Sequence, residues 1–125
     1  MSQTKVLLVD DEIEFVSALA ERLQLRNYNV KTGHTALEAM GFIHQFMPDV
    51  VVLDLKIPGM DGLEALKTIK KLDPTIEVIM LTGHGDVHSV EEGMKSGAFE
   101  YIMKPIDIGE LTSKIDKAKK KRINV

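Results

Sequence analysis

The chain has 125 residues, a hydrophobic fraction of 44%, a charged fraction of 28% and a formal net charge of −3. These values are ordinary for one globular core, so we expect residues 1–125 to form a single domain. The small negative charge gives no general attraction to nucleic acid or membrane, and the absence of cysteine excludes disulfides and thiolate chemistry. No apolar stretch approaches the ~20 residues of a membrane span, and no signal peptide precedes the first apolar run, so we expect a cytoplasmic protein.

The first half of the chain alternates short apolar runs with helical patterns. Residues 5–9 are typical of a buried strand, and Asp10 and Asp11 follow them directly. A helix is expected next, with an apolar stripe that consists of Ile13, Val16, Ala20 and Leu23. Residues 30–32 predict a short second strand, after which Thr35 can cap a second helix. The apolar face expected of that helix consists of Leu37, Met40 and Ile43.

The same alternation continues through the middle of the chain. Residues 50–53 are branched and apolar, and they predict a third buried strand that leads into Asp54. Pro-Gly and Asp-Gly pairs then indicate a loop. The stripe of the third helix consists of Leu63, Leu66 and Ile69. Residues 77–81 predict the fourth strand.

The last third of the chain carries two more helices around a short strand. Asp86 is expected to cap a helix that ends at Gly97. The apolar stripe of that helix consists of Val87, Val90 and Met94. Residues 100–103 predict the fifth strand, and Asp107 then opens the last helix with Glu110 as the second half of a capping box. The stripe of the last helix consists of Ile108, Leu111, Ile115 and Ala118.

A strand followed by a helix therefore occurs five times, with short connections. This order predicts an α/β fold, an open parallel sheet with helices on both faces. Right-handed crossovers leave few possible topologies. The flavodoxin-like strand order 2-1-3-4-5 fits the count and places the first and third strands side by side.

Charged and polar side chains follow four of the predicted strands. They are Asp10 and Asp11 after the first, Asp54 after the third, Thr82 after the fourth and Lys104 after the fifth. In the 2-1-3-4-5 order these strand ends lie next to one another and form one cleft. Clustered carboxylates repel each other, and Mg²⁺ or a lysine ammonium can offset that repulsion. Carboxylates, a cation and a lysine favour phosphoryl transfer, in which an aspartate can itself be the nucleophile.

At this point the chain resembles the receiver domain of two-component response regulators over nearly its whole length. The motifs that carry the resemblance are Val9-Asp10-Asp11-Glu12, Leu53-Asp54, Pro58-Gly59-Met60-Asp61-Gly62, Leu81-Thr82-Gly83, and Tyr101 three residues before Lys104-Pro105. The resemblance implies that Asp54 accepts a phosphoryl group from a phosphohistidine of a sensor histidine kinase or phosphotransfer protein. The segment 81–87 is similar to receivers of transcriptional regulators.

The resemblance also implies roles for the neighbours of Asp54. Asp11 would ligate Mg²⁺ directly and Asp10 mainly through water, while Asp54 and the backbone carbonyl of Lys56 would complete the protein ligands. Lys104 would pair with the phosphoryl group.

A conformational switch is the last implication of the resemblance. Thr82 would hydrogen-bond the phosphoryl group, and Tyr101 would move inward as Thr82 shifts. This would change the surface of the fourth helix, fifth strand and fifth helix, through which a homodimer can form. The physical basis is that phosphorylation adds roughly −1.5 to −2 charges and strong acceptors, while the glycines of the loop 83–86 allow its dihedral angles to change. We also expect a cis peptide bond at Lys104-Pro105.

Structural interpretations of the same residues remain open from the sequence. Asp10 and Asp11 can serve as helix caps, and Thr82 and Tyr101 as packing residues. The basic run Lys117–Arg122 is interpreted as a solvated helix end, where cations favour the macrodipole, rather than as a nucleic-acid patch. His84 and His88 are four residues apart but are separated by a glycine, which disfavours a zinc site.

Two other functions compete with the phosphorylated switch. One is a Mg²⁺-dependent phosphatase of the haloacid-dehalogenase type, which uses Asp-x-Asp after its first strand. Here the nucleophile candidate follows the third strand, and Lys56 stands two residues after Asp54. The other is a receiver-like interaction module that works without phosphorylation, which the complete acid set and Lys104 disfavour. We therefore expect a signalling switch rather than an enzyme, with no direct contact to nucleic acid or membrane.

Overall fold

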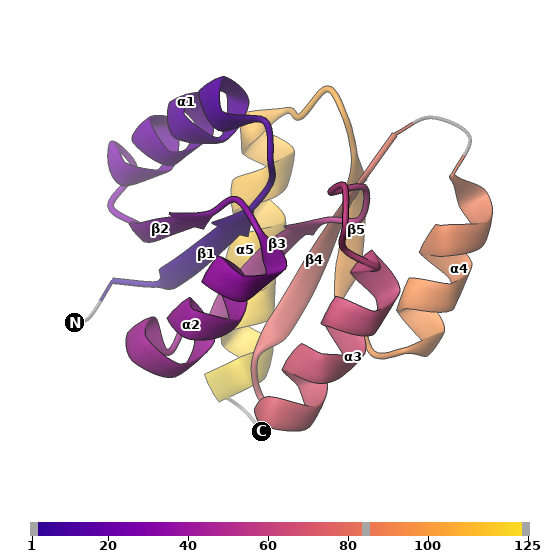
Figure 1. Cartoon of the computed structure of the whole chain (residues 1–125). Helices are drawn as coiled ribbons and strands as arrows, with labels where there is room; N and C mark the ends of the chain where they lie inside the picture. The colour runs from indigo at the N-terminus through magenta and orange to yellow at the C-terminus, as the bar shows by residue number, and fades with distance from the viewer. Residues whose placement is uncertain (1–2, 84–85, 124–125) are drawn as a thin grey trace.

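A computed structural model describes residues 3–83 and 86–123 and shows a three-layer α/β fold (Figure 1). The strands are β1 (Lys5–Val9), β2 (Asn29–Gly33), β3 (Val50–Asp54), β4 (Glu77–Thr82) and β5 (Glu100–Met103). The helices are α1 (Ile13–Gln24), α2 (Ala36–Phe46), α3 (Gly62–Leu72), α4 (Val87–Lys95) and α5 (Ile108–Ile123). All strand pairs are parallel, in the order β2-β1-β3-β4-β5, which confirms the predicted topology.

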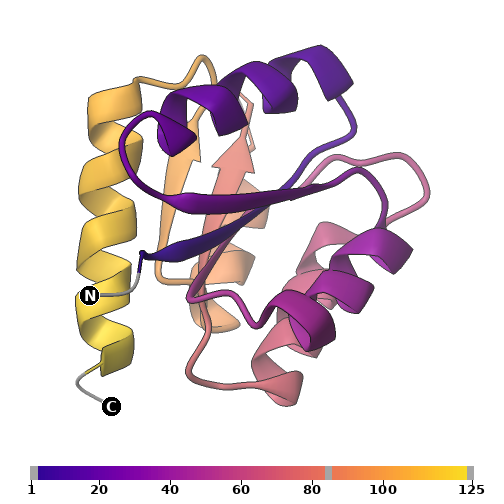
Figure 2. The same cartoon turned by 90° about the vertical axis from the view of Figure 1, so that its left-hand side faces the viewer.

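The sheet is covered on both faces because the middle positions of its inner strands β1, β3 and β4 are apolar and buried. Side chains alternate between faces along a strand. Val6 and Leu8 of β1 join the core under α1 and α5, whereas Leu7 and Val9 join the core under α2 and α3. Figure 2 shows α1 and α5 on one side of the sheet and α2 and α3 on the other. Within the described ranges, no helix is long and apolar enough to cross a membrane.

The predicted capping residues lie at the starts of their helices, but not all of them make the expected hydrogen bonds. Thr35 Oγ1 accepts a hydrogen bond from the Glu38 N–H at 3.1 Å, as predicted. Asp107 Oδ2 accepts one from the Glu110 N–H at 2.9 Å, but the Glu110 carboxylate lies 3.4 Å from Lys114, so the capping box is half formed. Asp86 occupies the N-cap position of α4, yet within the described residues its side chain makes no capping hydrogen bond.

Two of the predicted apolar faces are wrong at the first turn of the helix. Ile13 of α1 is exposed, and Leu37 of α2 is 85% exposed. The buried residues of α2 are Ala39 and Ile43, which are four positions apart and therefore share a face. Ala39 packs so closely that a Cβ on Gly33 would lie 3.4 Å from its backbone nitrogen. With Ala39 and Ile43 facing the sheet, Leu37 faces solvent.

The predicted apolar stripe of α4 is wrong at two of its three residues, while Val90 is half-buried. Within α4, all of which the structure describes, Gly93 is the buried residue, while Val87 and Met94 are exposed. A Cβ at position 93 would overlap the side chain of Met80 in β4. The helix therefore rests on the sheet through its glycine, and Val87 and Met94 stay on the surface.

The basic run at the end of α5 is only partly solvated, contrary to the sequence interpretation. Arg122 Nη1 lies 2.7 Å from Asp49 Oδ1, and Lys119 Nζ lies 2.9 Å from Asp49 Oδ2. Lys121 Nζ lies 3.0 Å from Glu77 Oε2. Asp49 and Glu77 are buried where β3 and β4 begin, so these ion pairs fasten the end of α5 to the amino edge of the sheet.

We predict opposite effects from alanine at two helical glycines. A Cβ on Gly62 would lie 2.7 Å from Leu55 Cα and 2.8 Å from its carbonyl oxygen, so the backbone must move. Gly62→Ala should lower the free energy of unfolding by about 1–3 kcal/mol. Gly41 has open space around it in the middle of α2, and Gly41→Ala should raise that free energy by about 0.5–1 kcal/mol. Urea unfolding measures both, and equal effects would contradict the close contact at Gly62.

Candidate functional site

The carboxyl edge of the sheet brings Asp10, Asp54 and Lys104 together, as the topology predicts. Asp10 follows β1, and its N–H donates to the Gly33 carbonyl at 3.1 Å, which extends the ladder to β2. Asp54 is the last residue of β3. Lys104 follows β5, and its N–H donates to the Thr82 carbonyl at 2.8 Å. Backbone pairing therefore positions each of these three residues at the same edge.

The ammonium of Lys104 lies among three carboxylates. Its Nζ is 3.0 Å from Asp10 Oδ2, 3.0 Å from Glu12 Oε1 and 3.2 Å from Asp54 Oδ2. The second oxygen of each aspartate is held by backbone: Asp10 Oδ1 accepts from the Glu12 N–H and Asp54 Oδ1 from the Lys56 N–H, both at 2.9 Å. The two aspartates are thus fixed in orientation, and the lysine crosses the end of β4 to reach them.

Burial and charge act against each other at this edge. Asp10 is 1% exposed, and this burial raises the pKa of its carboxyl above the ordinary value, although the Glu12 N–H and Lys104 oppose the rise. Burial acts to lower the pKa of Lys104, but Asp10, Glu12 and Asp54 outweigh it and raise that pKa. The lysine therefore stays charged at neutral pH and neutralises part of the acid cluster.

The acid cluster fits a hard divalent cation. Asp10, Glu12 and Asp54 each offer a carboxylate oxygen within 4.8 Å of the others. Asp10 Oδ2 is buried, and the Lys104 ammonium lies 3.0 Å from it. Carboxylate oxygens that converge in this way are suitable ligands for Mg²⁺, which prefers oxygen. Asp11 is exposed and is not among these three, so its direct ligation and that of the Lys56 carbonyl stay predictions.

Glu12 is the residue of this edge to which sequence reasoning assigned no role. It belongs to the motif Val9-Asp10-Asp11-Glu12, but its position after the first strand does not indicate where its side chain points. The structure shows Glu12 at the N-cap of α1, with its carboxylate 3.0 Å from Lys104 Nζ. The one feature of the sequence that could have indicated this contact is the acidic residue two positions after Asp10.

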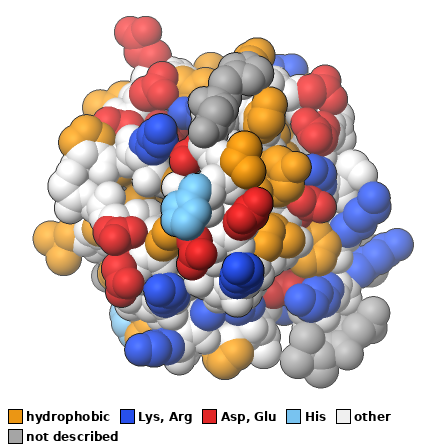
Figure 3. Space-filling model, turned by 90° about the vertical axis from the view of Figure 1, so that its right-hand side faces the viewer, with side chains coloured by type: hydrophobic (Ala, Val, Ile, Leu, Met, Phe, Trp, Pro, Cys, Tyr) orange, Lys and Arg blue, Asp and Glu red, His pale blue; other side chains and the backbone are white. Residues whose placement is uncertain are grey.

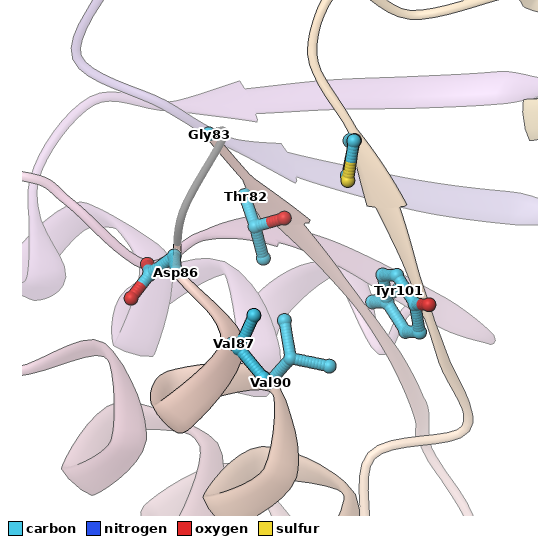
Figure 4. A pocket seen from close by; sticks show the side chains of 7 residues that line it. Thr82, Gly83, Asp86, Val87, Val90 and Tyr101 are labelled. Carbon is cyan, nitrogen blue, oxygen red and sulfur yellow. The ribbon is translucent and has the colours of Figure 1, made fainter.

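Thr82 and Tyr101 lie on the α4 side of the edge, around one pocket. Thr82 is buried, and among the described residues its hydroxyl has no hydrogen-bond partner. Figure 4 shows the pocket, with Val87 and Val90 of α4 facing Thr82 on β4 and Tyr101 beside it on β5. Tyr101 is exposed. The peptide bond Lys104-Pro105 is cis, as predicted, and His84 of the zinc hypothesis lies outside the described residues.

The family model for the response regulator receiver domain matches residues 6–116. The chain belongs to this family. It is 36% identical over 117 residues to Sporulation initiation phosphotransferase F of Bacillus subtilis, and the match covers 94% of each protein. It is 34% identical over 116 residues to Transcriptional regulatory protein ZraR of Klebsiella oxytoca, of which it spans 26%.

Solved structures agree with this assignment. A response regulator receiver domain protein from Clostridium thermocellum superposes with a TM-score of 0.91 at 34% identity, over 96% of this chain and 97% of that one. A CheY-like receiver domain protein from Methanospirillum hungatei superposes with a TM-score of 0.92 at 29% identity, over 98% of both chains. The fold is therefore the CheY-like receiver fold.

Family membership supplies a general function. Receiver domains of two-component systems act as signalling phosphoacceptors rather than as classical enzymes, and they interact with histidine kinases or phosphotransfer proteins. They bind Mg²⁺ through acidic residues. Both features agree with the carboxylates and the lysine at the edge of this sheet.

We predict that the site depends on Lys104 for stability when no metal is added. Removal of the ammonium leaves the buried carboxylates of Asp10 and Asp54 facing each other. In Mg²⁺-free buffer at neutral pH, Lys104→Met should lower the free energy of unfolding by about 1–3 kcal/mol. Lys117→Met, on the exposed face of α5, should change it by less than about 0.5 kcal/mol. Chemical denaturation measures both; equal losses would show that the lysine does not neutralise the cluster.

Proposed function

We propose that residues 1–125 form a single receiver domain in which Asp54 accepts a phosphoryl group from a sensor histidine kinase or phosphotransfer protein. The observation that supports this proposal is the position of Asp54 at the end of β3, 3.2 Å from the Lys104 ammonium. One carboxylate oxygen is held by the Lys56 N–H, so the side chain presents a fixed direction to an incoming phosphorus atom. A fixed nucleophile next to a cation is what phosphoryl transfer requires.

In this reaction a bond forms between an Asp54 oxygen and phosphorus while the phosphorus–nitrogen bond of the donor histidine breaks. Asp10, Asp11, Asp54 and the Lys56 carbonyl would hold Mg²⁺, which neutralises charge on the phosphoryl oxygens. Lys104 would then pair with one of those oxygens as a point charge. The domain would catalyse only its own phosphorylation and dephosphorylation, so we classify it as a switch and not as an enzyme.

The proposed output is a change of the surface made by α4, β5 and α5. The Thr82 hydroxyl is a donor without a partner in the described structure, and a phosphoryl group on Asp54 would offer it an acceptor. Movement of Thr82 toward Asp54 would enlarge the pocket of Figure 4, and Tyr101 could then turn inward from its exposed position. Two packings of this kind can differ by a small free energy, as a population shift requires.

The same surface is the proposed contact for an output partner or a second copy of the chain. The exposed large apolar residues of its α4 and β5 parts are Val87, Met94, Tyr101 and Met103. Figure 3 shows hydrophobic side chains gathered on the face that carries α4. Exposed apolar residues that lie together favour a protein partner over nucleic acid or a membrane surface. The similarity to transcriptional regulators supports an output in transcription, carried out by a partner or another domain.

We predict that Asp54 is the phosphoacceptor. Incubation with acetyl phosphate and Mg²⁺ should add the mass of one phosphoryl group to the wild-type chain, as measured by intact-mass spectrometry. Asp54→Asn should abolish the gain, and omission of Mg²⁺ should prevent it. Asp61→Asn is the matched control, because Asp61 caps α3 in the neighbouring loop and asparagine caps equally well.

An adduct on Asp54→Asn, or an equal adduct without Mg²⁺, would contradict the proposed acceptor or its metal dependence. If no adduct forms on the wild type, binding of fluoroberyllate distinguishes a short-lived phosphoryl group from a site that does not react. Failure of both would favour the phosphorylation-independent module.

We predict that Thr82 transmits the change to Tyr101. Fluoroberyllate and Mg²⁺ should shift the amide resonances of α4 and β5 in the wild type, because Thr82 turns toward the new acceptor. Thr82→Val keeps the shape but removes the hydroxyl, so most of these shifts should disappear while those near Asp54 remain. Thr68→Val on the exposed face of α3 is the control and should behave like the wild type. Unchanged shifts in Thr82→Val would show that another group couples the two regions.

A further inference from the structure

Lys104 occupies the place where a metal ion would be bound. The three acids whose oxygens converge for a cation, Asp10, Glu12 and Asp54, are the three acids in contact with the lysine ammonium. An ammonium and a divalent cation repel each other and therefore compete for these oxygens. Binding of Mg²⁺ to the aspartates would thus favour movement of the lysine away from them.

The three acids differ in whether their side chains can move together with the lysine. Asp10 and Asp54 are buried, and backbone N–H groups hold one oxygen of each. The Glu12 side chain is 62% exposed and, although Glu12 is the N-cap of α1, it makes no capping hydrogen bond within the described residues. The Glu12 carboxylate therefore contacts Lys104 at 3.0 Å without also accepting a hydrogen bond from the backbone of α1 within the described residues. Because the side chain is long and exposed, it can move outward with the lysine.

Phe15, one turn further along α1, adds a second contact for the same ammonium. Its ring centroid lies 4.7 Å from Lys104 Nζ, within the range of a cation–π interaction. Glu12 and Phe15 are three residues apart and therefore share one face of the helix. The start of α1 thus offers Lys104 a carboxylate and an aromatic face that are independent of the two buried aspartates.

We propose that Glu12, supported by Phe15, is a positioning residue that holds the Lys104 ammonium when Mg²⁺ takes Asp10 and Asp54. This inference rests on the proposed function, because it assumes that Mg²⁺ binds at this edge. With Glu12 present, the lysine exchanges one carboxylate contact for another and stays near the place where a phosphoryl group arrives. Without Glu12, the lysine remains a competitor of the metal ion for the aspartates.

The test is a double-mutant cycle of Mg²⁺ affinity, measured by isothermal titration calorimetry on the unphosphorylated chain. Glu12→Gln should weaken Mg²⁺ binding about three- to tenfold, the range of a charge-assisted contact at a partly exposed site. Glu14→Gln removes the same charge from an exposed position of the same helix and should change binding less than about twofold. Lys104→Met should tighten binding, and adding Glu12→Gln to it should then have an effect similar to that of Glu14→Gln.

The cycle separates the two ways in which Glu12 can act. Equal weakening by Glu12→Gln in the wild-type and Lys104→Met backgrounds would overturn the proposal, because Glu12 would then act on the metal directly. No weakening in the wild type would also overturn it. Failure of Mg²⁺ to bind the wild type would instead contradict the metal site of the proposed function. Circular dichroism confirms that each variant is folded before titration.

Discussion

Repulsion between carboxylates at one edge of the sheet is the constraint on which this structure depends. Asp10 and Asp54 are brought together because β1 and β3 are neighbours, and both are buried. Burial makes their charges costly unless a cation is present. Lys104 provides that cation from β5 by reaching across the end of β4. The contacts of Lys104 and the suitability of this edge for a metal ion both follow from this balance of charge.

The sequence predicted this edge well because the chemistry sits where strands end. Branched apolar runs marked the inner strands, and the alternation of strands with helices led to the order 2-1-3-4-5. That order placed Asp10 and Asp54 together without knowledge of any side-chain conformation. The role of Glu12 was not predicted because the direction of its side chain depends on the angle at which the chain passes from β1 into α1. A strand period of two residues cannot specify that angle.

The helices were predicted less well, for a related reason. Hydrophobic periodicity identifies a stripe but not how closely a helix approaches the sheet. Small residues decide that distance: Ala39 brings α2 down beside Gly33, and Gly93 brings α4 down onto Met80. Larger apolar residues such as Leu37 and Val87 are then left outside. The basic end of α5 was misinterpreted because its partners, Asp49 and Glu77, are distant in sequence and looked like ordinary strand-end residues.

The ion pairs at the end of α5 have a consequence for how charge is distributed between the two edges of the sheet. There, at the amino edge of the sheet, basic groups outnumber the acids they contact, whereas at the opposite edge acids outnumber the one lysine among them. Among these groups, the excess charge is thus positive at the amino edge and negative at the carboxyl edge. An acidic edge attracts divalent cations and repels anionic phosphodonors. A bound metal ion would lessen that repulsion, and salt weakens both effects beyond about 10 Å at 0.1 M ionic strength.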